Sequence, residues 1–479
     1  MKNNWKSGFL ALSFVLLFTS CKMVKTMEQS ARVEDKTVPA QFADTLSNDT
    51  TRQTQLNWKQ TFSDPLLIKL IDEALIKNQE LGIIEQEMMA IQAEARAKKG
   101  ELLPNAGLRL GAGMDKFGEY TRDGAVESQL EVEPGKHFPH PMGDFMVGAY
   151  FSWEIDIWKK VRNGRDAQLA RYMSSVEGQN FVRTQIVSEI AMSYYELQAL
   201  DNKLEIVNRN IAIQTEALEV VKKQKDAARV TQLAVNRFEA QLLNTKNLQY
   251  EIKQAIIKNE NTINFLLGRY PQSVERDSKH FQSVDLAPIY VGVPSQLLMN
   301  RPDIRQAEQD LLAAKLDVKV AKASFLPQLG IHANVGMNAY NPKVWFSPQS
   351  LLYNLVGDLI VPLVNRNGLN AQYLVFNAKR NQSIINYERS ILKAYTEVVN
   401  QLAMIDNYTN SYKTKAEEVS LLNHAVDISG ELFSSARADY MEVLLTQRET
   451  IESAMDLVEI KLKQMQAKIG LYKSLGGGW

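Results

Sequence analysis

The sequence predicts a mainly α-helical fold that also contains membrane β-strands, built from two internal structural repeats. Three observations support this prediction. An apolar residue recurs every seven positions in two stretches of the chain, the stretches stand 208 residues apart, and a pair of short alternating segments accompanies each. A sustained seven-residue apolar repeat indicates a long helix in a coiled-coil-like seam, and two copies in register indicate a duplication.

The apolar positions of the first stretch coincide with apolar positions of the second when 208 is added to each number. We interpret them as packing residues and expect two similar halves to lie side by side. The two sets are Ile190, Leu197, Leu204, Ile211 and Leu218, and Val398, Ile405, Tyr412, Val419 and Val426.

The N-terminus has the layout of a secretory signal peptide over residues 1–20. Lys2 and Lys6 precede an apolar run that is shorter than the roughly 20 residues of a permanent transmembrane helix. The run ends just before Cys21, the only cysteine of the sequence. Because this pattern resembles a bacterial lipobox, we favour lipidation of Cys21 over a plain signal peptide with a chance cysteine. Residues 21–58 are then expected to form a lipid-anchored tether.

The first repeat is expected over residues 59–268. Asp64 and Pro65 are expected to begin a helix, because proline suits a first helical turn. The apolar stripe of this helix continues to about residue 100. Strand-like alternation follows at about 107–113 and 145–155. A long heptad helix and a return helix then complete the repeat.

The second repeat is expected over residues 301–473, after an inter-repeat linker at 269–300. It has the same order of elements, with strands at about 329–337 and 353–363. The glycine-rich end, residues 474–479, is expected to be a flexible tail.

The lengths of these elements limit the architecture. A helix of about 60 residues is roughly 90–100 Å long. Strands of about ten residues match the ~9–11 residues that cross an outer membrane as tilted strands. Known barrels have about eight strands or more, so four strands cannot close one. If these segments are membrane strands, several chains must therefore share a transmembrane β-barrel.

Composition gives no support for catalysis or nucleic-acid binding. Lysine plus arginine (55) balances aspartate plus glutamate (55), and the sequence lacks P-loop, HExxH, GxSxG and CxxC motifs. His137 and His140 have no acidic or thiol ligand placed to join them in a metal site. We expect no enzyme activity, no cofactor, no metal and no nucleic acid.

Residues 293–308, VPSQLLMNRPDIRQAE, closely resemble the signature of outer membrane efflux lipoproteins. These are the TolC-like outer membrane factors of the NodT type, which serve RND-type pumps. The resemblance continues at residues 62–67, 153–158, 325–327 and 440–444, and covers the chain from Cys21 to about residue 473.

The resemblance implies a homotrimer that shares one β-barrel, extended into the periplasm by a long α-helical coiled-coil barrel. It also implies a cell outer membrane location and two partners, a periplasmic adaptor protein and an inner-membrane RND pump. The chain would be a passive exit duct for small molecules. Two alternatives stay open: a TolC-like duct for protein or peptide secretion, and a periplasmic coiled-coil lipoprotein scaffold without membrane strands.

Arg301, Pro302, Asp303 and Arg305 are interpreted as a structural linker motif. Pro302 suits a first helical turn, and Asp303 favours the positive end of the helix. Arg301 and Arg305 are expected to join the linker to neighbouring helices through carboxylates.

Arg437, Asp439 and Glu442 are candidates for a periplasmic aperture. The resemblance places the second helical hairpin on the inner face of the tunnel near its closed end. Acidic residues brought together there by threefold symmetry would repel one another unless a cation bridged them. We hypothesise that Arg437 bridges to Asp439 or Glu442 of a neighbouring copy, the alternative being a solvated helix tip.

Two departures from the family pattern concern turns. The family usually has glycine after Trp158, where this chain has Lys159, and often has glycine at the positions of Ala228 and Ala436. Alanine resists positive φ. We therefore expect the strand-to-helix turn to be built differently, and the tip turn to shift by a residue or stay more helical.

Aromatic residues cluster near the second strand of the first repeat. They fit an interfacial belt at the rim of the barrel, and they are Tyr150, Phe151, Trp153 and Trp158.

Overall fold

The computed structural model describes residues 32–42, 58–286, 292–364, 366–435 and 437–478. The predicted signal peptide and Cys21 lie outside these residues. The chain folds as two compact units. One, here called the sheet unit, contains Met89–Met173 and Gln309–Ile385, and the other, the helical unit, contains Glu34–Met88, Ser174–Glu308 and Asn386–Trp479. Each unit takes segments from both repeats.

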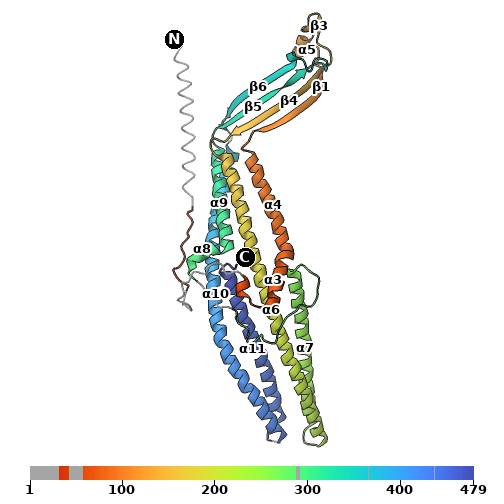
Figure 1. Cartoon of the computed structure of the whole chain (residues 1–479), viewed down its shortest axis with the longest axis vertical. Helices are drawn as coiled ribbons and strands as arrows, with labels where there is room; N and C mark the ends of the chain where they lie inside the picture. Colours follow the sequence, from red (N-terminus) through yellow and green to blue (C-terminus); the bar gives the residue numbers. More distant parts are fainter. Residues whose placement is uncertain (1–31, 43–57, 287–291, 365, 436, 479) are drawn as a thin grey trace. The chain divides into compact units, whose positions relative to one another are not determined.

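The duplication itself is visible in the order and lengths of the elements (Figure 1). The two longest helices have 67 and 68 residues, their return helices 35 each, and the helices before the strands 22 each. The first copy contains α4 (Gln79–Gly100), β1 (Asn105–Asp115), β4 (Met142–Ile155), α6 (Lys160–Asp226) and α7 (Gln232–Leu266). The second contains α9 (Pro302–Ala323), β5 (Gln328–Ala339), β6 (Leu351–Ile360), α10 (Asn367–Ser434) and α11 (Tyr440–Ser474).

The connection between the two strands is longer in the first copy. It contains α5 (Arg122–Glu127), β2 (Glu131–Glu133) and β3 (Lys136–His137), whereas the second copy has only η3 (Pro348–Ser350). The offset between copies is therefore not constant. Elements before this connection are related by a shift of 223 residues, as Gln328 is to Asn105, and elements after it by 208, as Tyr440 is to Gln232.

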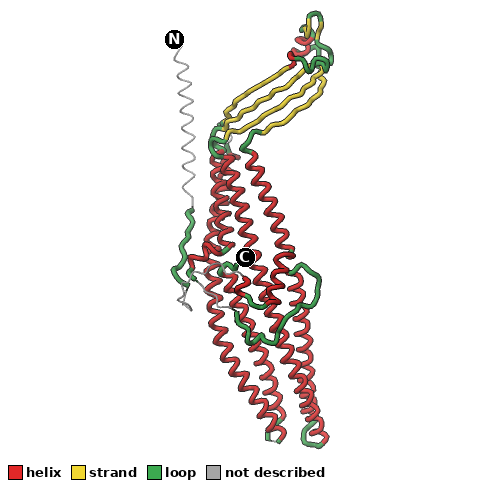
Figure 2. Tube along the Cα trace, in the orientation of Figure 1, coloured by secondary structure: helices red, strands yellow, loops and turns green. Residues whose placement is uncertain are grey.

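The four longer strands form one antiparallel sheet in the order β1-β4-β5-β6. Figure 2 shows these strands in yellow. All four predicted strands exist, but with different bounds. The segments expected at 107–113, 145–155 and 329–337 extend further at one end or both. The strand expected at 353–363 begins at Leu351 and ends at Ile360, because β6 ends where its pairing with Gln328 ends.

The helix expected from Pro65 to about residue 100 is interrupted, which corrects the prediction. It consists of α3 (Pro65–Lys77) and α4, separated by Asn78 in extended backbone with ψ 127°. Asp64 caps α3, accepting a hydrogen bond from the Leu66 N–H at 2.9 Å. The Asn78 Oδ1 in turn accepts hydrogen bonds from the first backbone N–H groups of α4, at 2.9 and 3.2 Å. Both helix starts thus carry a side-chain cap.

The main core lies in the helical unit. Apolar side chains of α3, α6, α7 and α11 form one buried cluster, whose fully buried members include Phe62, Tyr194 and Ile263. The linker between the repeats closes over it through Arg276, which binds Asp201 and Glu260 at 2.6 Å each. Because these ion pairs are mostly shielded from water, the part of the linker around Arg276 is held in place rather than free.

The heptad residues differ in burial between the copies. In α6, Ile190, Leu197 and Leu218 are buried, whereas in α10 only Val398 is buried and the other four are half-exposed. The second hairpin therefore leaves part of its apolar seam uncovered within one chain.

Three described helix ends share one turn, the Schellman motif, and Ala228 occupies its left-handed position after α6. Ala228 has φ 55°, its N–H donates to the Lys225 carbonyl, and the Arg229 N–H donates to the Gln224 carbonyl. The expectation that alanine would avoid this conformation is wrong, because two backbone hydrogen bonds hold the turn. Lys159, with φ 59°, likewise adopts the left-handed conformation that glycine favours.

Replacing Ala228 with glycine is expected to stabilise the protein by about 1 kcal/mol. A left-handed non-glycine residue costs roughly 1–2 kcal/mol, part of which the greater backbone freedom of glycine cancels. Thermal unfolding of Ala228→Gly and of the adjacent control Ala227→Gly measures the difference. Ala227 is not among the residues with positive φ, so equal changes in the two variants would contradict the strain.

The glycine-rich end is packed, which corrects the expectation of a flexible tail. Gly476 and Gly478 are buried, and the Tyr472 hydroxyl accepts a hydrogen bond from the Gly478 N–H at 3.0 Å. Gly476, with φ 105°, occupies the Schellman position after α11, as Gly268 does after α7. The structure describes the chain to Gly478.

Among the described residues, none of the helices is both apolar and long enough to cross a membrane.

Candidate functional site

The four-stranded sheet has one apolar face and one polar face. Directly paired residues show this: Leu108, Ala149, Val335 and Tyr353 are aligned across the four strands on one face. One residue further along, Gly107, Tyr150, Asn334 and Asn354 are aligned on the other. The apolar face also carries Leu110, Val147, Phe151, Trp153, Ile331, Leu355 and Leu359. A sheet with this alternation can separate lipid from an aqueous space.

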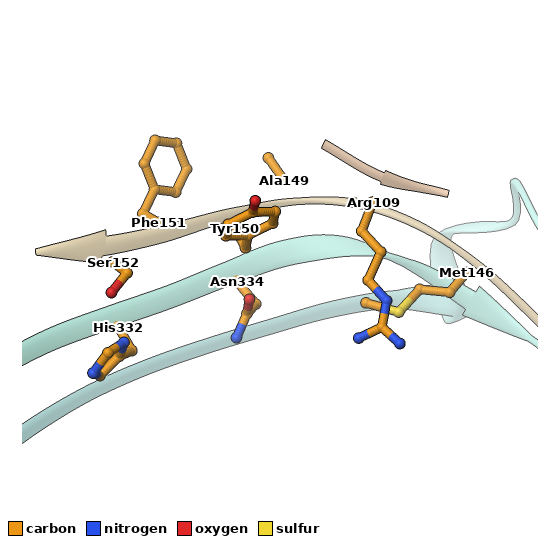
Figure 3. A pocket seen from close by; sticks show the side chains of 9 residues that line it. Arg109, Met146, Ala149, Tyr150, Phe151, Ser152, His332 and Asn334 are labelled. Carbon is orange, nitrogen blue, oxygen red and sulfur yellow. The ribbon is translucent and has the colours of Figure 1, made fainter. Parts of the chain in front are cut away.

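The polar face contains a shallow hollow of about 290 Å³ near its middle. Figure 3 shows Arg109, Asn334 and His332 on one side of the strands, and Phe151 and Ala149 on the other. The His332 Nε2 lies 3.6 Å from the Asp358 Oδ1, and the Asn338 side chain donates to Asp144 at 3.0 Å. The polar side chains that line the hollow itself are Arg109, Tyr150, Ser152, His332 and Asn334, and they form no catalytic constellation.

Glycines on the polar face leave room for neighbouring side chains and strands to approach the backbone closely. A Cβ added to Gly107 would lie 2.6 Å from the Tyr150 ring, which covers it. Gly148 and Gly336 are directly paired, and a Cβ on Gly336 would lie 2.4 Å from the Val147 carbonyl oxygen. The polar face therefore needs glycine at these positions for strands and side chains to approach closely.

The aromatic belt expected at the strand end is divided between the two faces. Phe151 and Trp153 lie on the apolar face, but Tyr150 lies on the polar face, so Tyr150 does not belong to a lipid-facing belt. The indoles of Trp153 and Trp158 each donate to a backbone carbonyl, those of Leu102 and Pro327, at 3.1 and 2.7 Å.

The two hairpin ends pack against each other within the helical unit. Tyr440 and Leu444 of α11 join an apolar cluster with Val235 and Phe238 of α7. Beside this cluster, Arg437, Asp439 and Glu442 are exposed.

The charged residues at the end of the second hairpin make no ion pair with one another in the described part of the chain. Asp439 stands at the N-cap position of α11 but its side chain makes no capping bond, and Glu442 lies in the first turn. Both carboxylates therefore remain open to a neighbouring molecule. Ala436 lies outside the described residues.

The linker motif places a buried cation at the junction of three helices. Arg301 is 3% exposed and binds Asp303 and Glu397 at 2.7 Å each, while its Nη1 donates to the Ser474 carbonyl at 2.9 Å. Arg305 binds the buried Glu177 at 2.5 Å. Pro302 is the first residue of α9 and Asp303 lies in its first turn.

Arg301 is the structural equivalent of Asn78, which inspection of the sequence missed. Each stands in extended backbone between two helices, and their numbers differ by the 223-residue shift. Asn78 donates to the Leu266 carbonyl near the end of α7, just as Arg301 donates to the Ser474 carbonyl at the end of α11. In each copy, the residue that stands just before the helix leading to the first strand also binds a carbonyl at the end of the return helix.

The sheet with one apolar and one polar face is the kind of element that a β-barrel membrane protein requires. The chain belongs to the outer membrane efflux protein family, whose model matches residues 70–269 and 293–477. The family expected from residues 293–308 is thereby confirmed. The protein is a transport duct of the outer membrane and not an enzyme.

Individual relatives are distant but nearly full-length. The chain is 25% identical to the solvent efflux pump outer membrane protein SrpC of Pseudomonas putida, over 88% of this chain and 87% of the relative. It is 28% identical to the pyoverdine export outer membrane protein OpmQ of Pseudomonas aeruginosa, with the same coverage. The crystal structure of CusC has the same fold, with a TM-score of 0.80, 22% identity, and 94% of this chain and 100% of that chain covered.

Proposed function

We propose that three copies of this chain form the exit duct of a tripartite efflux system. The duct conducts small molecules passively from a periplasmic adaptor and an inner-membrane RND pump to the exterior, and acyl chains on Cys21 hold it to the membrane. The observation that carries the proposal is the amphipathic four-stranded sheet, whose outer strands β1 and β6 are paired on one side only. Lipid does not tolerate unpaired strand edges, so a spanning sheet of four strands requires further copies.

Efflux is favoured over secretion by the relatives, which are named for solvent efflux and pyoverdine export. Their cargoes differ chemically, so the exported compound does not follow from the fold. The scaffold alternative has no use for an apolar face on the sheet, and that face argues against it.

The test is made on the full-length chain expressed with its signal sequence in an outer membrane. Metabolic labelling with radioactive palmitate should mark the native chain but not Cys21→Ala. Native mass spectrometry in detergent should give a trimer, and planar bilayers should show ion conductance. A monomer without conductance would overturn the duct, and an adaptor of an ABC-type exporter in cross-linked complexes would move the proposal to secretion.

The aperture hypothesis predicts that Asp439→Ala combined with Glu442→Ala raises the resting conductance and lowers the preference for cations. In a trimer, Arg437 of one copy would bridge to these carboxylates of the next and hold the end closed. Exposed pairs contribute about 0–1 kcal/mol each, so three pairs change the open population by at most about a hundredfold.

Planar-bilayer recordings compare this variant with Glu417→Ala combined with Glu431→Ala, which removes the same charge from exposed sites on α10. Identical recordings for the two double variants would refute the aperture and leave the duct itself untouched.

A further inference from the structure

The two edge strands of the sheet carry opposite charges on the polar face. Arg109 is the one basic residue of β1, and Asp358 is the one charged residue of β6. Both lie on the polar face. Arg109 pairs with Gly148 and Asp358 pairs with Gly330, and these two glycines belong to the polar face of β4 and β5. In the proposed trimer, on which this inference rests, β6 of one copy must pair with β1 of the next.

The edge strands are displaced along the sheet relative to each other. Following the direct pairs from β1 through β4 and β5 to β6 places Arg109 at the same height in the sheet as Leu352. Asn105, the first residue of β1, is in the same way level with Val356. The remainder of β6, from Gly357 to Ile360, extends beyond the start of β1 in the same chain. A neighbouring copy placed at the same level would therefore leave the end of β6 and the far end of β1 unpaired.

An offset between copies restores the pairing, and barrel geometry requires one. Strands in barrels tilt by about 35–45°, which demands a stagger at each turn around the barrel. The offset must be even, because an odd one would place apolar residues on the polar face. Offsets of about four to six residues pair all or nearly all of β6 with β1 of the neighbour.

Both offsets bring the two charges together. At about six residues, Arg109 of the neighbour lies directly opposite Asp358, and at about four it lies opposite Val356, diagonal to Asp358. Directly opposite residues have Cβ atoms ~4.5–5.5 Å apart and diagonal ones are ~7–8 Å apart, within reach of a long side chain.

The contacts within one chain leave both groups available. Arg109 is exposed and has no ion pair in the described part of the chain. The Asp358 Oδ1 lies over Gly330, is shielded from water and accepts no hydrogen bond among the described residues, and the His332 Nε2 lies 3.6 Å from it. The Asp358 side chain as a whole is 34% exposed, so the rest of the carboxylate can accept a hydrogen bond from a neighbouring copy.

We propose that Arg109 of each copy binds Asp358 of the adjacent copy across the β1–β6 seam, forming three ion pairs on the inner wall of the barrel. Each pair fixes the offset between β6 of one copy and β1 of the next, because a smaller offset would move the two charges apart. It also completes the surroundings of the Asp358 carboxylate beside His332.

The first test is cysteine cross-linking in the full-length protein. Arg109→Cys combined with Asp358→Cys should link chains into covalent trimers when treated with a short bifunctional thiol reagent. Arg109→Cys combined with Leu352→Cys is the control. Leu352 is level with Arg109 in its own chain, three strands away, so this pair links copies only if the seam has no offset. Cys21 is present in every variant, and the single-cysteine replacements measure its contribution.

The second test exchanges the charges. Arg109→Asp and Asp358→Arg should each lower the temperature at which the trimer dissociates in detergent, and the double variant should recover most of the loss. Linking through Leu352→Cys, or additive losses in the double variant, would overturn the ion pair while leaving the trimeric duct intact. A native chain that is monomeric in the membrane would overturn the duct and the seam together.

Discussion

Arg301→Met is expected to destabilise the helical unit by about 3–5 kcal/mol, because it removes the cation from a buried network and leaves its anions behind. The Arg301 side chain is 4% exposed, and it binds two carboxylates and the Ser474 carbonyl. Burial acts to lower the pKa of Arg301, but Asp303 and Glu397 outweigh it and hold the pKa above its usual value. The guanidinium is therefore charged throughout the physiological range.

The matched control is Lys393→Met, which removes a cation from the same Glu397 at the surface. The Lys393 side chain is 66% exposed and its Nζ lies 3.8 Å from the carboxylate, so its loss should cost no more than about 1 kcal/mol. Thermal unfolding and the yield of assembled protein compare the two variants. Similar losses in both would show that Arg301 does not support the junction.

Gly476→Ala is expected to cost about 3 kcal/mol, for two separate reasons. The residue has φ 105°, which side chains rarely adopt, and a Cβ there would lie 2.6 Å from the Asn300 carbonyl oxygen and 2.9 Å from its carbon. Backbone strain of this kind costs about 1–3 kcal/mol, and overpacking adds a similar amount. Since the contact is with backbone, a side-chain rotation cannot relieve it.

Gly430→Ala provides the opposite expectation within the same hairpin. Gly430 lies inside α10 with open space where its Cβ would be, so alanine should stabilise the helix by roughly 0.5–1 kcal/mol. Changes of opposite sign in the melting temperatures of the two variants are the expected result. A neutral Gly476→Ala variant would show that the end of the chain does not pack on Asn300.

Much of this fold could be predicted from periodicity. The heptads located α6 and α10, and alternation located the four strands, because long or repeated patterns reflect which face is buried. The interruption at Asn78 could not be found in this way. It depends on a hydrogen bond to Leu266, a residue far along the chain, and nothing in the local sequence indicates that partner.

The equivalence of Asn78 and Arg301 was hidden for a related reason. The 208-residue shift holds only after the longer connection of the first copy, and the residues at the two interruptions are chemically different. The tip turn at Ala228 was predicted wrongly from the preference of glycine for positive φ. There the backbone hydrogen bonds of the turn outweigh the strain on alanine. The packed end of the chain was mistaken for a tail because small residues can indicate either freedom or close approach.

The unequal connections between the strands have an evolutionary consequence. Only the first copy carries the segment with α5, β2 and β3, and most of its residues are exposed. In the proposed trimer this segment would occur three times around the mouth, alternating with the short connection at η3. The sequence of this exposed segment can therefore change in length and composition without altering either helical hairpin.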